Sequence, residues 1–179
     1  MKAKILSVLL AIFMPAIAGA ALPYVGTYKT IDDETGMAKS IVVLYEYQHG
    51  KKSNLAGRIV ALFDEAGGLS ETLKNPERVA DKVTGSPKMV GMDILWRMDW
   101  DAEEGRYKGG RILDPKSGKN YASIIWQDAE PILNVRGKIG PIGRTQHWEL
   151  MDSESLPEEI RNLDTSTWQP VEISNKKKK

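Results

Sequence analysis

Apolar and polar residues alternate along short stretches of this chain, and polar turn residues separate the stretches. The clearest case is 91–100, where Met92, Ile94, Trp96 and Met98 occupy every second position. A period of two with large apolar side chains on one face predicts a half-buried β-strand. Similar stretches predict eight strands in all, at residues 23–31, 40–47, 55–63, 91–100, 106–113, 119–127, 132–139 and 143–150.

The strongest turn signal lies within 107–126. Two runs rich in β-branched and aromatic residues flank Asp114-Pro115-Lys116-Ser117-Gly118. Proline presets φ, aspartate and serine bond the local backbone, and glycine accepts a left-handed conformation, so this pattern predicts a β-hairpin. The pair Gly109-Gly110 is not followed by a helix, so it predicts a bulge, a bend or a close backbone approach and not a phosphate loop.

The short turns between successive strands favour an all-β fold, an eight-stranded antiparallel up-and-down barrel, over a β-sandwich. Residues 64–90 form the one long connection, in which 70–73 could start a short helix, and we expect this loop over or beside one mouth of the barrel. The alternation ends after residue 151. We expect an irregular C-terminal extension, 152–179, disordered in part, with a helical turn near Pro157 and with Trp168 packed back on the barrel.

A barrel that crosses an outer membrane is a rival interpretation, and it requires apolar residues at the lipid-facing positions. Charged residues lie amid the predicted strands instead: Lys29, Glu46, Arg58, Arg97, Lys108 and Arg111. We therefore expect a chain that does not span a membrane and that is a monomer or a weak dimer.

Residues 1–20 have the pattern of a secretory signal peptide. Lys2 and Lys4 precede an apolar run that ends in Ala18-Gly19-Ala20. The run is shorter than a transmembrane helix needs. We expect cleavage near Ala20, a periplasmic or secreted location, and one barrel domain over 21–151.

Charge and cysteine content exclude several classes of function. The 179 residues include 25 lysines and arginines, 24 acidic residues and no cysteine. This balance gives no electrostatic footprint for nucleic acid, and disulfides, thiolate metal sites and a cysteine nucleophile are impossible. For the closing lysine run, 176–179, a solvated tail is favoured over a contact with anionic lipid or another envelope component.

Three segments occur in one order: Gly91-Met92, the hairpin 109–121, and 135–140, which reads Val-Arg-Gly-Lys-Ile-Gly. With them, and with the opening segment 30–36, the chain resembles the bacterial family catalogued as domain of unknown function 2147 (DUF2147) over residues 26–148. The resemblance implies an exported protein with a calycin-type, lipocalin-like barrel and no established activity.

The resemblance also implies how the barrel closes. Calycins begin with Gly-x-Trp on the first strand and bring an arginine from the last strand across that ring. The matching residues here are Gly26, Tyr28 and Arg144, with Trp148 further along the last predicted strand. A guanidinium over an aromatic ring contributes about 0.5–2 kcal/mol. These four residues are therefore expected to have a structural role.

No set of residues indicates catalysis. His49 and His147 lack the spacing of a metal-binding pair and are expected to face solvent. The acidic segment 32–34 does not match a calcium-binding loop and is better explained as a turn. We expect no metal and no cofactor.

An eight-stranded barrel is either filled by its side chains or holds one small ligand. Inward-facing arginines would favour a ligand carboxylate. The candidate lining residues are Tyr45, Arg58, Phe63, Ile94, Trp96, Tyr107, Tyr121 and Arg136. The sequence favours a carrier of a small apolar or amphipathic molecule. The alternative is a filled barrel that acts as an interaction or assembly scaffold for an envelope protein, and an enzyme is disfavoured.

Overall fold

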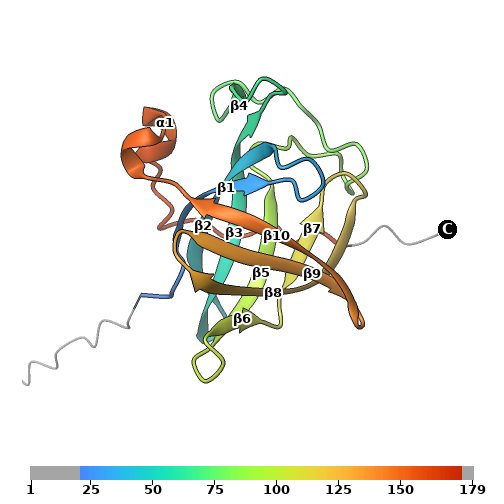
Figure 1. The fold of residues 1–179 in the computed structure, drawn as a ribbon, viewed down its shortest axis with the longest axis vertical. Coiled ribbons are helices and arrows are strands. Elements are labelled where there is room, and N and C mark those ends of the chain that lie inside the picture. Colours follow the sequence, from blue (N-terminus) through green and yellow to red (C-terminus); the bar gives the residue numbers. More distant parts are fainter. Residues whose placement is uncertain (1–20, 175–179) are drawn as a thin grey trace, which may run out of the picture.

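A computed structural model describes residues 21–174, which form ten β-strands and two short helical segments (Figure 1). The predicted signal peptide and the lysine run at 176–179 lie outside the described residues. In chain order the elements are β1 (Gly26–Ile31), β2 (Ala38–His49), β3 (Lys52–Phe63), β4 (Leu69–Thr72), β5 (Asp93–Asp101), β6 (Arg106–Lys108), β7 (Arg111–Asp114), β8 (Lys119–Ala129), β9 (Ile132–Ile139), β10 (Ile142–Leu150), the 3₁₀ helix η1 (Ser153–Ser155) and α1 (Glu158–Arg161).

The sheet closes into a barrel because β1 pairs with β10 on one side and with β2 on the other. Thr30, for example, lies opposite both Trp148 and Ser40. β6 and β7 occupy one strand position between β5 and β8, so the barrel has eight positions in sequential antiparallel order, as the sequence predicts. The additional strand β4 pairs only with β3 within the described residues.

Gly109 and Gly110 interrupt the strand that β6 and β7 share. Gly109 has a φ of +81°, a conformation that favours glycine. A Cβ on Gly110 would lie 2.5 Å from the carbonyl oxygen of Trp96. The predicted bend and close backbone approach are both confirmed.

The strand register identifies the inner face of the barrel. Gly57 lies opposite Leu44 on β2 and Leu95 on β5, and a Cβ on Gly57 would come within 2.9 Å of Leu44 and 3.2 Å of Leu95. The barrel is filled by side chains that belong to the main buried cluster and are at most 2 % exposed: Tyr28, Val42, Leu44, Leu55, Ile59, Leu95, Met98, Tyr107, Ile125, Leu133, Val135 and Trp148.

The segment that precedes β1 covers one end of the barrel. The hydroxyl of Tyr107 donates to the carbonyl oxygen of Pro23 at 2.7 Å, and the ring of Tyr24 packs edge-on against Trp100. Tyr28 donates to the carbonyl oxygen of Tyr24, and burial raises the pKa of Tyr28 to about 12. These aromatic residues therefore attach the segment that precedes β1 to the core.

The long connection after β3 packs against the rest of the core. Ala80, Val83 and Val90 are buried in the main cluster, and Gly118 lies so close to the carbonyl group of Lys82 that a Cβ would overlap it. The possible helix at 70–73 is wrong, since these residues belong largely to β4. Pairing with β3 supplies their backbone hydrogen bonds, whereas the helix pattern lacked an acid at its fourth place.

Residues 152–174, called the C-terminal segment below, run along the outside of the barrel. Outward-facing Ile41, Val43 and Val60 pack against Leu156, which directly follows η1, and against Ile160 of α1. The predicted extension was expected to be disordered in part, but its described residues form this covering layer. No helix within 21–174 is both long and apolar enough to cross a membrane.

The alternation on β5 changes at Arg97, which has a φ of +56°. Leu95 and Met98 both face inward, opposite Gly57 and Leu55, so Trp96 points outward. The predicted apolar face of Met92, Ile94, Trp96 and Met98 is therefore wrong at Trp96. The left-handed residue shifts the side-chain alternation by one position, as β-bulges do.

Gly57→Val tests whether the interior is full. The new side chain would overlap Leu44 and Leu95, and overpacking of this kind costs about 2 kcal/mol. We expect urea denaturation to show a free energy of unfolding lower by that amount. Gly68→Val is the matched control, because a Cβ there meets only the Asp64 side chain, at 3.4 Å or more. An unchanged stability of Gly57→Val would show free space inside the barrel.

Candidate functional site

The predicted lining residues divide between the two faces of the barrel. Tyr107, Ile94 and Trp96 all belong to the main buried cluster, but Trp96 pairs with exposed Arg111 and lies on the outer face. Tyr121 lies opposite inward-facing Ile112. The others lie outside, so their prediction as lining residues is wrong: Tyr45, Arg58, Phe63, Trp96 and Arg136. For Tyr45, Arg58 and Phe63 the physical reason is that the C-terminal segment also covers the outer face of β2 and β3, so burial there does not mark the inside.

Arg58 and Asp93 form the centre of a buried polar cluster under the C-terminal segment. Arg58 donates through Nε and Nη2 to the two carboxylate oxygens of Asp93, both at 2.9 Å. Asp93 is 1 % exposed and also accepts from the Tyr45 hydroxyl at 2.8 Å and the Val171 amide at 2.9 Å. The guanidinium stacks 4.4 Å from the ring centroid of Trp168. The cluster therefore joins β2, β3 and β5 to the C-terminal segment.

The protonation of this cluster is fixed by its surroundings. Burial, followed by the neighbouring Asp93 carboxylate, raises the pKa of Tyr45 far above its ordinary value. Tyr45 therefore remains a hydrogen-bond donor at any physiological pH. All four hydrogen bonds are accepted by the carboxylate oxygens of Asp93, so both oxygens of this buried group have partners. We assign this cluster a structural role.

The residues expected to close the barrel follow the resemblance only in part. Tyr28 and Trp148 are buried, and Gly26 pairs with Leu44. Arg144, however, does not cross the Tyr28 ring, and this prediction is wrong. Its guanidinium instead forms ion pairs with Asp33 and Glu34 in the turn between β1 and β2, because Tyr28 pairs with Leu150 at the other end of β10.

The same acidic turn is held by its own side chains. Asp32 accepts from the amides of Glu34 and Thr35, at 3.2 and 3.0 Å, and from the Thr35 hydroxyl. The Thr35 amide is the main reason that the pKa of Asp32 is far below its usual range. A hydrogen bond from Arg144 lowers the pKa of Asp33. Among residues 21–174, no cluster of three or more histidines and carboxylates has the geometry of a metal site.

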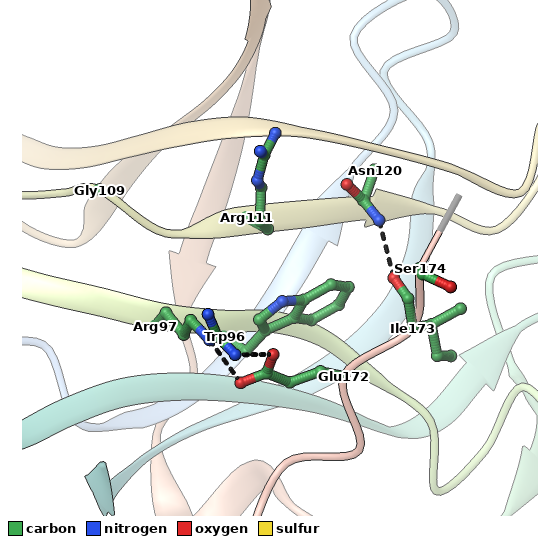
Figure 2. A pocket seen from close by; sticks show the side chains of 8 residues that line it. All are labelled: Trp96, Arg97, Gly109, Arg111, Asn120, Glu172, Ile173 and Ser174. Atoms are coloured by element: carbon green, nitrogen blue, oxygen red, sulfur yellow. Dashed lines mark hydrogen bonds and ion pairs between the residues drawn. The ribbon is translucent and has the colours of Figure 1, made fainter. Parts of the chain in front are cut away.

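Two hollows lie next to each other on the outer face of β5, β7 and β8. The first, of about 380 Å³, is bounded by Trp96, Arg97, Arg111, Asn120, Glu172 and Ile173 (Figure 2). The second, of about 410 Å³, is bounded by Arg111, Lys119, Asn120, Tyr121, Lys138 and Ile139. Arg111 and Asn120 line both hollows, so the two form one continuous groove. This groove is the candidate functional site.

The charges of the groove differ from one end to the other. In the first hollow Arg97 is paired with Glu172 of the C-terminal segment, and Asn120 donates to the carbonyl oxygen of Ile173 at 2.7 Å. Figure 2 shows Arg111 pointing away from Glu172. The second hollow is lined by three basic residues and by no acidic residue. The groove can therefore attract an anionic group at its second hollow.

Comparison with known proteins identifies the family. Residues 26–149 match the family model described as "Uncharacterized protein conserved in bacteria (DUF2147)". The chain belongs to the DUF2147 family. This confirms the resemblance seen in the sequence. A search of curated proteins finds no match.

Among solved structures, the DUF2147 chain is similar to protein HP1028 from Helicobacter pylori, which is described as belonging to the lipocalin family. The two share 19 % sequence identity with a TM-score of 0.54, over 76 % of this chain and 86 % of the other. At this identity the likeness shows the lipocalin-like fold alone.

The sequence pattern of the DUF2147 chain does not reveal the groove. Arg111, Lys119 and Lys138 lie on different strands, and the register of β7, β8 and β9, in which Arg111 and Lys138 both pair with Ala122, brings them to one hollow. A usable signal was present in 138–142, which reads Lys-Ile-Gly-Pro-Ile. Two isoleucines that flank a Gly-Pro turn at a hairpin tip are unusual, since turns are normally polar.

The acidic turn predicts a loss of stability in acid. Asp32 and Asp33 have lower pKa values in the folded chain than in the unfolded chain, where aspartate titrates near about 4. Their contribution to the free energy of unfolding is complete at pH values above about 4. It is lost as the pH falls through the pKa values of the folded state. We expect urea midpoints to fall between about pH 5 and about pH 2, with a smaller fall for Asp32→Asn. Asp81→Asn, which removes an exposed carboxylate, should show the same fall in urea midpoint as the wild type. An equal fall in the wild type, Asp32→Asn and Asp81→Asn would contradict the assignment to the acidic turn.

Arg58→Met tests the buried cluster of the DUF2147 chain. It leaves the Asp93 carboxylate buried without its cation, which costs about 3 kcal/mol. We expect this loss in urea denaturation, together with faster hydrogen exchange of the Val171 amide, which donates to Asp93. Lys52→Met breaks an exposed ion pair with Asp99 and should cost less than about 1 kcal/mol. Unchanged exchange at Val171 would show that the cluster does not hold the C-terminal segment.

Proposed function

We propose that this DUF2147 protein is an exported, non-enzymatic binding protein that engages its partner on the outside of a side-chain-filled barrel. The observation that carries the proposal is the packing of the interior. Trp148, Tyr107 and Leu95 are completely buried in it, and even the glycine at 57 has no room for a methyl group without displacing Leu44. Of the two functions that the sequence left open, this packing favours the scaffold over the carrier.

The outer surface supplies the features that a binding protein needs. The groove formed by the two hollows is open to solvent and is lined by charged, amide and aromatic side chains. Its walls are rigid, because they belong to paired strands of the barrel. Export, which the pattern of residues 1–20 predicts, would place this surface among envelope or extracellular partners.

Native mass spectrometry of the protein purified from its own host tests the proposal. We expect the mass of the polypeptide alone, both before and after extraction with organic solvent. We also expect a fluorescent fatty acid to show no saturable binding, because the interior has no room for an acyl chain.

Leu133→Ala is the positive control for an interior site. It removes a fully buried side chain and should open an apolar void that admits benzene or xenon. A host molecule released from the wild-type protein by extraction would overturn the proposal in favour of a carrier. Saturable fatty-acid binding by the wild type that Gly57→Val abolishes would do the same.

A further inference from the structure

The second hollow exists because two strands separate. β8 and β9 are paired as far as Ala122 and Lys138, and beyond this pair β8 continues alongside β7 while β9 continues alongside β10. The tip of the β9–β10 hairpin projects beyond the body of the barrel (Figure 1). The hollow of about 410 Å³ lies where they diverge, between the start of β8 and this tip.

Three basic side chains line this hollow: Arg111, Lys119 and Lys138. Within residues 21–174 none of the three forms an ion pair, and no acidic residue lines the hollow. Elsewhere on the strands, by contrast, basic residues have carboxylate partners, as in Lys29–Glu149, Lys108–Asp101 and Arg144–Asp33. The hollow is therefore a local concentration of positive charge in a chain whose net charge is only +1.

An apolar tip adjoins this charge. Ile139 lines the hollow and lies directly opposite Ile142 across the hairpin. The two side chains are 68 % and 78 % exposed, the highest values among the large hydrophobic residues of the described chain. The turn between them, Gly140-Pro141, contains no charged group. The tip thus presents two adjacent aliphatic side chains beside three cations.

We propose that the β9–β10 tip docks on an anionic lipid surface: Ile139 and Ile142 enter the boundary between headgroups and acyl chains, and Arg111, Lys119 and Lys138 bind lipid phosphates. Binding at a membrane interface has two components: burial of apolar side chains and electrostatic attraction to anionic lipids. A free phosphate would use the cations but not the isoleucines. A protein partner would need roughly 800 Å² of complementary surface, far more than a two-residue tip offers.

This inference rests on the proposed function, since it assigns a partner to the outer surface. The test is sedimentation of the full mature chain with vesicles of phosphatidylcholine alone or mixed with phosphatidylglycerol. We expect binding only to the mixed vesicles, weakening as salt is added. The double variant Lys119→Gln/Lys138→Gln should bind roughly thirtyfold more weakly, because each lysine near an anionic surface contributes about fivefold.

Ile139→Ser/Ile142→Ser should also weaken binding, by at least about tenfold, since it removes the groups that enter the apolar boundary. The matched controls are Lys51→Gln/Lys74→Gln, which removes the same charge from exposed positions elsewhere, and Val79→Ser, which removes another exposed aliphatic side chain. Both controls should bind like the wild type. All these positions are on the surface, and circular dichroism will verify that each variant is folded.

Three outcomes would overturn the inference. Binding that survives both double substitutions would place the contact elsewhere, for example at lysines 176–179. Inorganic phosphate that saturates the hollow, with no effect of the isoleucine substitutions on vesicle binding, would indicate a small-anion site. Absence of binding to the mixed vesicles would exclude the lipid surface. None of these outcomes would put a ligand inside the barrel, so the proposed function is tested separately by mass spectrometry.

Discussion

The pairing of β1 with β10 is the constraint on which the rest of the structure depends. It joins the first and last strands of the barrel, so that no edge of the closed sheet is left between them, and it gives every inward side chain neighbours around the full circle. Eight strands enclose just enough space for side chains to fill. Here Trp148, Tyr28 and Tyr107 are large enough to take that space, and their polar atoms reach partners near the ends of the barrel.

The outer face of the barrel is divided by the C-terminal segment. On β2 and β3 the outward side chains at the centre of the strands are aliphatic or aromatic apart from Arg58, and Leu156, Ile160 and Trp168 cover them. Asp93 holds this layer through one bidentate arginine, one tyrosine hydroxyl and one backbone amide. Lysine could not replace Arg58, because it has neither the planar fork nor the flat surface that stacks on Trp168. The other side of the barrel keeps its polar outward residues open to solvent.

The sequence alone predicts the number and order of the barrel strands, because period-two alternation and turn residues are local signals. The hairpin at 114–118 and the break at Gly109-Gly110 were found for the same reason. The side-chain directions were harder to predict. In the middle of β2, residues 41–45 are all apolar, so alternation cannot tell which face points inward, and the prediction for Tyr45 was wrong. On β5 the register with β3 shifts twice, between Asp93 and Leu95 and again near left-handed Arg97, and nothing in the neighbouring residues marks either bulge.

The candidate site could not be predicted in the same way, because it depends on how far strands diverge. Lys119 and Lys138 are 19 positions apart in the chain, and they line one hollow only because β8 does not pair with β9 before Ala122. Unneutralised cations repel one another, and exposed isoleucines carry a risk of aggregation. Neither feature contributes to the packing of the barrel. The unpaired cations and the exposed isoleucines lie side by side at one rim of the barrel, whereas many other basic residues on the strands form ion pairs. This combination is therefore best explained by binding and not by folding.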